Sequence, residues 1–186
     1  FNPMSFRNPA TGELEGYDIE AVEKLAADMG VETEYVPTEW RTLVAGIVSD
    51  KYDITTSASL SMDRAAVAGF SDAYVEFSTV PMTQAANVVQ YNSWEDLDRE
   101  DVIIAVTLGT VFEQQARGYF QNAQIRTAEA PAREWQEVIS GRATASITSN
   151  VDAAQLTATY PELAVIKVDE PLSRRPGAFL MPQADQ

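Results

Sequence analysis

Apolar positions along the chain follow the spacing of helices in some stretches and of strands in others. Residues 18–29 carry apolar side chains three and four positions apart, which predicts a helix that begins at Asp18, a favoured N-cap residue, and ends at Gly30. The β-branched and aromatic runs 31–36 and 52–57 predict strands, with an apolar-faced helix between them. Strands that alternate with helices in this way are typical of an α/β fold.

The second half of the chain repeats this alternation. It predicts strands at 102–107, 124–127 and 145–148, and helices at 111–120, 132–140 and 151–159. A long β-rich segment at 78–89 precedes the repeat, and return strands are predicted at 164–168 and 178–181. We therefore expect two lobes, the first formed by residues 1–84 with 168–186 and the second by residues 85–167. Each lobe is expected to hold a mainly parallel sheet flanked by helices, with a ligand cleft between the lobes.

Charge and composition exclude several classes of function. The 186 residues include 28 acidic and 13 basic side chains, a net charge of −15, which argues against nucleic acid and anionic membranes as partners. Cysteine and histidine are both absent, which removes disulfides, thiolate nucleophiles and the usual general base. Neither a metal nor a cofactor is predicted. The chain has no apolar run of roughly 20 residues, so direct membrane insertion is not expected.

The segment 57–64 carries the strongest candidate chemistry. Ser57 and Ser59 lie at the end of a predicted strand, Ser61 can cap a short helix, and Arg64 follows one turn later. Backbone N–H groups, hydroxyls and a guanidinium together bind an anion such as a carboxylate well. The alternative is a strand, a helix cap and a surface arginine without a ligand.

Small polar residues also follow strands in the second lobe, where Gly109-Thr110 and Ser149-Asn150 come after 102–107 and 145–148. In α/β sheets, ligands bind at the carboxyl ends of strands. These residues therefore predict a pocket for a polar small molecule.

Several segments, taken in order over nearly the whole chain, resemble those of bacterial periplasmic solute-binding proteins of the amino-acid class, which are the extracellular solute-binding proteins of family 3. They are residues 1–6, 16–20, 40–43, 52–54, 59–64, 70–74, 109–110 and 140–142. The resemblance implies a type II periplasmic-binding-protein-like fold whose two lobes close on a ligand. It further implies a periplasmic, monomeric binding protein, not an enzyme, that delivers a small carboxylate to the permease of an ABC transporter, or else a ligand-sensing domain of a receptor.

The resemblance also bears on the two ends of the chain. Family members normally have one more strand before the position of Phe1 and a helix or two after that of Gln186. We therefore expect a chain truncated at both ends, with the signal peptide removed.

Site residues are carried over by position. The family's carboxylate-binding arginine corresponds to Arg64, supported by Ser59 and by the backbone of Ser57. A second-lobe hydroxyl that contacts the same carboxylate corresponds to Thr110. The aromatic walls of the ligand site correspond to Phe1 and Trp40, although Trp40 also begins the apolar stripe of its predicted helix and can equally belong to the core.

The ligand's ammonium group raises a difficulty at Ser149. Amino-acid binders of this family usually place an Asp at this position to pair with the α-ammonium, and burying an ammonium without a counter-charge is costly. Either Asp152, one helical turn later, replaces that Asp, or the ligand is a carboxylate without an ammonium, such as a heterocyclic acid. A solvated Asp152 favoured by the helix dipole is the simplest alternative.

A rival function comes from cyclohexadienyl dehydratases, which act on prephenate or arogenate and resemble residues 149–182. Their general acid is a Glu at the position of Asp152, which would be the catalytic residue here. Asp is one methylene shorter, and the dehydratases keep the Asp that is Ser149 in this chain. These two departures favour a binding protein.

Overall fold

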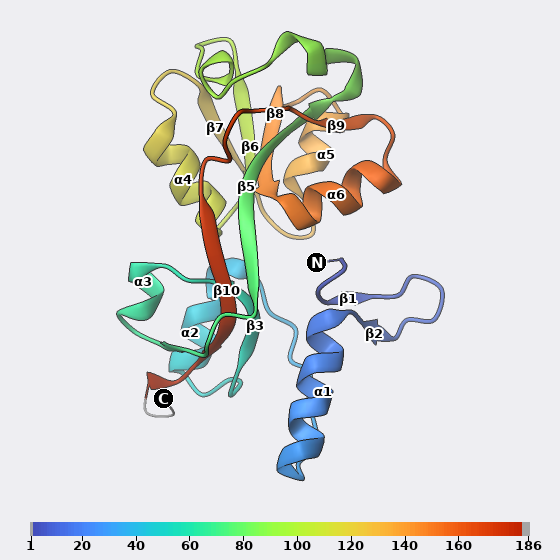
Figure 1. Cartoon of the computed structure of the whole chain (residues 1–186), viewed down its shortest axis with the longest axis vertical. Coiled ribbons are helices and arrows are strands. Elements are labelled where there is room, and N and C mark those ends of the chain that lie inside the picture. Colours follow the sequence, from blue (N-terminus) through green and yellow to red (C-terminus); the bar gives the residue numbers. More distant parts are fainter. Residues whose placement is uncertain (1, 184–186) are drawn as a thin grey trace. The chain divides into compact units, whose positions relative to one another are not determined.

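The computed structural model describes residues 2–183 of the chain (Figure 1). The α-helices are α1 (Tyr17–Met29), α2 (Leu43–Val48), α3 (Met62–Ala65), α4 (Val111–Tyr119), α5 (Glu134–Ile139) and α6 (Asn150–Thr159). The 3-10 helices are η1 (Trp40–Thr42), η2 (Ala85–Gln90) and η3 (Glu95–Leu97). The strands are β1 (Phe6–Arg7), β2 (Leu14–Glu15), β3 (Thr55–Ser59), β4 (Gly69–Phe70), β5 (Val75–Gln84), β6 (Ile103–Thr107), β7 (Gln124–Ala128), β8 (Ala145–Ser149), β9 (Leu163–Val165) and β10 (Arg174–Met181).

Contacts divide the chain into two compact units. Unit 1 holds Phe1–Thr38, Leu43–Val75 and Gly177–Gln186, and unit 2 holds Glu39–Thr42 and Glu76–Pro176. The predicted lobes, residues 1–84 with 168–186 and residues 85–167, remain a prediction. The units differ from them at residues 39–42, 76–84 and 168–176, which belong to unit 2, and at 76–84 the reason is that β5 pairs with β8 and β9.

In unit 1, strand pairing differs from the expected parallel sheet. β10 pairs antiparallel with both β3 and β4, and the hairpin of β1 and β2 is antiparallel too. The expectation of a mainly parallel sheet is wrong for this unit, because the neighbour of β3 is the returning strand β10. The expected strand at 31–36 is also wrong: this segment is not extended into a strand and is largely exposed. A β-branched pattern forms a strand only where a partner strand is available. Within residues 2–183, no strand pairs with the segment 31–36.

Helix α1 begins one residue earlier than predicted, and its N-cap is Gly16 rather than Asp18. Asp18 instead lies in the first turn with its side chain turned inward, and only 1% of the residue is exposed. Gly30 ends the helix in the left-handed conformation, as predicted. Burial of a charged residue this close to a helix start requires hydrogen-bond partners, which are described below.

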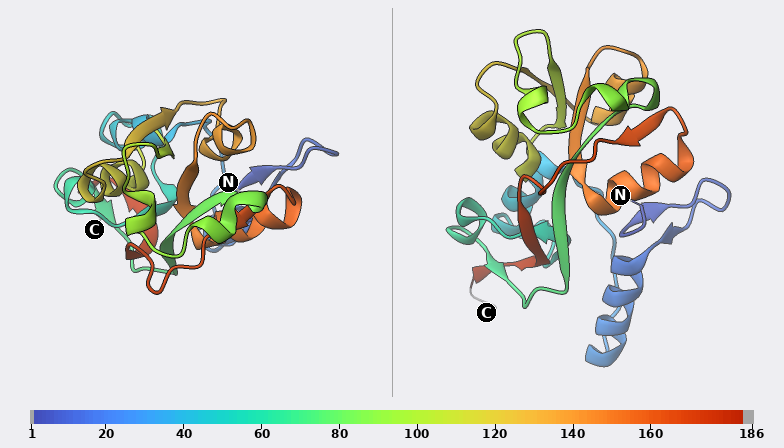
Figure 2. Two further views of the ribbon diagram at one scale, coloured as in Figure 1. Left: turned by 90° about the horizontal axis from the view of Figure 1, so that it is seen from above. Right: turned by 45° about the horizontal axis from the view of Figure 1, so that its top comes forward.

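In unit 2, three parallel strands form the centre of the sheet. β6 lies between β7 and β8, and β5 joins β8 antiparallel (Figure 1). Alternate residues of β6 face opposite sides: Ile104 and Val106 belong to the core that includes Ala116 of α4, whereas Ala105 belongs to the core with Val138 of α5. Figures 1 and 2 accordingly show α4 on one side of the sheet and α5 and α6 on the other. The predicted strand and helix order of this region is confirmed.

Gly109, which connects β6 to α4, is expected to tolerate no side chain. Its φ is +77°, and an added Cβ would lie 2.4 Å from the Cα of Arg41. Gly12 has nearly the same φ, +76°, with nothing within 4 Å. We expect Gly109→Ala to lower the free energy of unfolding by about 1–3 kcal/mol more than Gly12→Ala, which adds only backbone strain. Urea unfolding of the two variants checks this, and equal losses would contradict it.

Candidate functional site

The candidate grip in unit 1 consists of Ser57, Ser59 and Arg64, and all three residues are buried. Ser57 and Ser59 belong to β3, and Arg64 lies in α3, which directly follows. Ser61 caps α3 as predicted, with its Oγ accepting the Arg64 N–H at 3.4 Å. The Arg64 Nη1 donates to the carbonyl oxygen of Ser59 at 3.0 Å. The guanidinium is thereby held against the strand end, and the interpretation of Arg64 as a surface arginine is wrong, since 8% of the residue is exposed.

Two further residues, Asp18 and Tyr74, contact Ser57, and the sequence pattern did not link them to it. Asp18 accepts hydrogen bonds from Ser57 Oγ and from the hydroxyl of Tyr74, each at 2.7 Å. The Tyr74 hydroxyl in turn accepts the Ser57 N–H at 2.8 Å. Asp18 and Tyr74 lie 56 positions apart in sequence, so no local pattern links them to Ser57.

Thr110 is buried in unit 2 and caps α4. Its Oγ1 accepts the Glu113 N–H at 3.3 Å and donates to the Thr107 carbonyl at 2.7 Å. The Glu113 carboxylate accepts the Gly109 N–H at 2.8 Å. The polar groups of this turn are therefore engaged with one another, and Thr110 would donate to a ligand only by giving up its bond to Thr107.

Ser149 and Asp152 lie together at the start of α6. Ser149 is its N-cap, with Oγ accepting the Asp152 N–H at 3.0 Å, and Asp152 Oδ2 accepts a hydrogen bond from Thr148 at 3.0 Å. Only 6% of Asp152 is exposed, so the interpretation of Asp152 as a solvated residue is wrong. A buried carboxylate needs a counter-charge, and the structure supplies one from α5.

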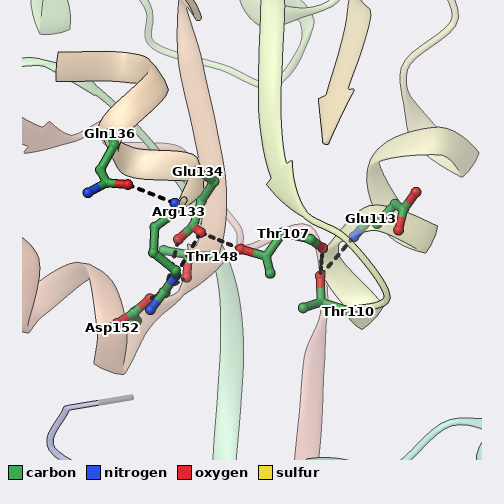
Figure 3. Close-up of polar contacts among 8 residues, drawn as sticks. All are labelled: Thr107, Thr110, Glu113, Arg133, Glu134, Gln136, Thr148 and Asp152. Carbon is green, nitrogen blue, oxygen red and sulfur yellow. Dashed lines mark hydrogen bonds and ion pairs between the residues drawn. The ribbon is translucent and has the colours of Figure 1, made fainter. Parts of the chain in front are cut away.

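Arg133, immediately before α5, supplies this counter-charge, and the sequence did not indicate it. Its Nη2 lies 2.9 Å from Asp152 Oδ2, and its Nε lies 3.2 Å from Oε2 of Glu134 (Figure 3). Glu134 is 1% exposed and also accepts a hydrogen bond from the Thr107 hydroxyl. One guanidinium thus pairs with two buried carboxylates. When both carboxylates are ionised, the cluster of Arg133, Glu134 and Asp152 has a net charge of −1.

The electrostatics of this cluster follow from burial and charge. Burial raises the pKa of Asp152, Arg133 acts to lower it and Glu134 to raise it, and the pKa is raised overall. Burial acts to lower the pKa of Arg133, but Glu134 and Asp152 outweigh it and raise that pKa. The cluster therefore presents fixed acceptors with excess negative charge, which suits a cationic group or a shared proton.

The remaining predicted residues are the aromatic ones. Trp40 begins η1, which belongs to unit 2, and the residue is half-buried. Phe1 lies outside the described residues. Within residues 2–183, no group of three acidic side chains is placed to hold a metal ion. The same part of the chain contains no helix with the length and apolar character needed to cross a membrane.

Fold and comparison with solved structures define the class of protein. The chain has the type II fold of periplasmic binding proteins, a mixed sheet flanked by helices. A crystal structure of an ancestral amino acid-binding protein, described as a precursor of cyclohexadienyl dehydratase, matches with a TM-score of 0.91 and 33% sequence identity, covering 100% of this chain and 79% of that one. The family model of the bacterial extracellular solute-binding proteins, family 3, matches residues 1–174, and the chain belongs to this family.

Two characterised relatives differ in function. The chain is 26% identical over 184 residues to the cyclohexadienyl dehydratase of Pseudomonas aeruginosa, covering 98% of this chain and 68% of that protein. It is 27% identical over 157 residues to the L-cystine-binding protein TcyJ of Escherichia coli, covering 84% of this chain and 58% of TcyJ. The family resemblance inferred from the sequence is confirmed. The relatives include both a binding protein and an enzyme, so similarity alone does not decide between these functions.

Proposed function

We propose that this protein captures a small carboxylate, an amino acid or a related organic or heterocyclic acid, for an ABC-type uptake system. The observation that carries the proposal is the buried Arg64, held at 3.0 Å against the Ser59 carbonyl in a member of a solute-binding family. A positioned guanidinium binds carboxylates through paired, charge-assisted hydrogen bonds. We further propose that the protein acts as a monomer in the periplasm, after removal of a signal peptide, and delivers its ligand to a membrane permease.

Roles for the other predicted residues are part of the proposal. Ser59 adds a hydrogen bond to the carboxylate. Ser57 adds one by giving up its bond to Asp18 or to Tyr74, and Thr110 adds one by giving up its bond to Thr107. Phe1 and Trp40 provide apolar walls. Ser149 and Asp152 set selectivity. Asp152 and Glu134 together carry two negative charges when ionised, and Arg133 neutralises only one of them. This supports a ligand with an ammonium group, which would neutralise the second charge.

A thermal-shift screen tests the proposal. The panel contains the common L-amino acids, L-cystine, carboxylates without an ammonium such as 3-phenylpropionate, and prephenate. A carboxylate at a hundred times its dissociation constant should stabilise the protein by about 2.7 kcal/mol. The proposal predicts at least one such shift from a carboxylate, and a stabilisation below about 1 kcal/mol from the matching carboxamide at the same concentration. A panel without any stabilising carboxylate would contradict it.

A cyclohexadienyl dehydratase is the second candidate, favoured by the similarity to the Pseudomonas aeruginosa enzyme and by the buried Asp152, whose pKa is raised. In this function Asp152 would be the general acid. The two departures in the sequence argue against it: the side chain of Asp152 is one methylene shorter than the Glu of the dehydratases, and Ser149 stands where they keep an Asp.

We therefore expect no turnover of prephenate or arogenate by the wild-type protein. Absorbance or chromatographic assays of both compounds, at high protein concentration, check this. Steady consumption that Asp152→Asn abolishes would reverse the assignment and make Asp152 the catalytic residue.

A further inference from the structure

Unit 1 contains a strained serine within its sheet. Ser57 has a φ of 53°, in the left-handed region that residues other than glycine rarely adopt. The register between β3 and β10 shifts here, since Ala58 pairs with Ala178 but Thr55 pairs with Leu180. Two residues of β3 therefore lie opposite one residue of β10, which makes a β-bulge. Bulges with a left-handed residue usually have glycine at that position.

Three hydrogen bonds form a ring around this serine. The Ser57 N–H donates to the Tyr74 hydroxyl at 2.8 Å, and that hydroxyl donates to Asp18 Oδ1 at 2.7 Å. The Ser57 Oγ donates to the other carboxylate oxygen, Asp18 Oδ2, at 2.7 Å. The ring therefore holds the serine by its backbone and its side chain at once. Such doubled restraint can maintain a conformation that the serine alone would avoid.

The two partners of Ser57 are themselves fixed. Asp18 is buried within the first turn of α1, where its position follows the helix backbone. The Tyr74 ring stacks on Tyr17 with centroids 6.0 Å apart and packs against Phe179 at 4.9 Å. Burial, and then the hydrogen bond to Asp18, raise the pKa of Tyr74, so the hydroxyl stays protonated and can donate.

The conformation of Ser57 affects the residues of the candidate grip. Ser59 follows two residues later on the same strand, and its carbonyl holds Arg64. A shift of one residue in a strand turns every later side chain to the opposite face of the sheet. Loss of the bulge would therefore change where Ser59 and Arg64 point.

We propose that Asp18 and Tyr74 are positioning residues, which keep Ser57 in its left-handed conformation and thereby place Ser59 and Arg64 for a carboxylate. This inference rests on the proposed function. Neither residue needs to touch the ligand. Glycine adopts positive φ without strain, so a glycine at position 57 should make the ring largely unnecessary.

Tyr74→Phe, made alone and in the Ser57→Gly background, tests the inference. The probe is the panel carboxylate with the largest thermal shift, and its Kd is measured by calorimetry at a temperature where all variants are folded. Tyr74→Phe alone should weaken binding about tenfold, the effect of about one lost hydrogen bond. In the Ser57→Gly background the same change should weaken binding by less than about threefold. Tyr119→Phe, whose hydroxyl lies 3.4 Å from Glu95 Oε1 in unit 2, is the control and should leave Kd unchanged.

Equal weakening by Tyr74→Phe in both backgrounds, or no weakening in either, would overturn the inference. Urea unfolding without ligand separates this result from a failure of the proposed function. If the wild type binds no panel carboxylate, the proposed function fails. The ring then still predicts that Tyr74→Phe lowers the urea midpoint more in the wild-type background than in the Ser57→Gly background, and equal lowering refutes it.

Discussion

Replacing Arg64 with alanine is expected to weaken binding of the carboxylate by about 2–5 kcal/mol, which is roughly 30-fold or more in Kd. The reason is that the ligand's carboxylate would lose a buried, hydrogen-bonded counter-charge while still being taken out of water. Calorimetric titration of the wild type and of Arg64→Ala with the strongest panel carboxylate measures the difference. Binding that survives the substitution within about threefold would place the carboxylate site elsewhere.

Two controls make this result interpretable. Arg64→Lys keeps the positive charge but cannot form the bidentate geometry, so its Kd should fall between those of the wild type and Arg64→Ala. Arg99→Ala removes an exposed arginine whose Nε lies 3.2 Å from Asp101 in unit 2, and should leave Kd unchanged. Because Arg64 also binds the Ser59 carbonyl, all titrations belong at a temperature where circular dichroism shows each variant folded.

Replacing Arg133 with methionine is expected to lower the free energy of unfolding by about 3 kcal/mol at neutral pH. The change removes the only cation that the described contacts place against both Asp152 and Glu134, and leaves two buried carboxylates facing each other. Removing one partner of a buried ion pair costs about 3–5 kcal/mol of stability. We expect the lower end of this range because 35% of the Arg133 side chain is exposed. Urea unfolding measures the loss, and Arg117→Met, whose arginine is 54% exposed, should cost less than about 1 kcal/mol.

The loss in Arg133→Met should also depend on pH. The pKa of Asp152 is already raised above its ordinary value of 3.8, and removing Arg133 raises it further. Between its pKa in the unfolded state and its higher pKa in the folded state, such a carboxyl binds more protons in the folded protein. The free energy of unfolding therefore falls as the pH rises through this range. The cost of Arg133→Met should therefore shrink as the pH falls from 7 toward 5, and Asp152→Asn should recover much of it at pH 7. A cost that is independent of pH would contradict this account of the cluster.

Much of unit 2 was predictable from the sequence because its elements are specified locally. The apolar runs of β6 and β8 carry their own signals, as do the small polar residues Thr110 and Ser149 at the strand ends, and the structure has these strands and helices near the predicted bounds. Ser61 likewise caps α3 before Arg64. Local rules fail where a partner decides the outcome. Residues 31–36 have a strand pattern without a strand, and Asp18, which reads as a helix cap, turns inward to bind Ser57 and Tyr74.

The polar networks were beyond prediction for the same reason. Arg133, the N-cap of α5, lies 19 residues before Asp152 of α6, and the sequence singled out Asp152 but not its partner. The bulge at Ser57 depends on the register with β10, more than a hundred residues away in sequence. A single sequence gives residue types and periodicity but not such long-range pairing. The predicted grip residues were identifiable because they are close together in the chain, whereas the residues that hold them in place were not.

The most direct test of the central claim compares one carboxylate with its own carboxamide. Calorimetry on the wild-type protein titrates the panel carboxylate with the largest thermal shift and then the matching primary amide, which has nearly the same shape without the negative charge. If Arg64 recognises a carboxylate, the acid binds and the amide binds at least about 30-fold more weakly. An amide that binds as tightly as the acid would show that the ligand's carboxylate is not what this protein recognises.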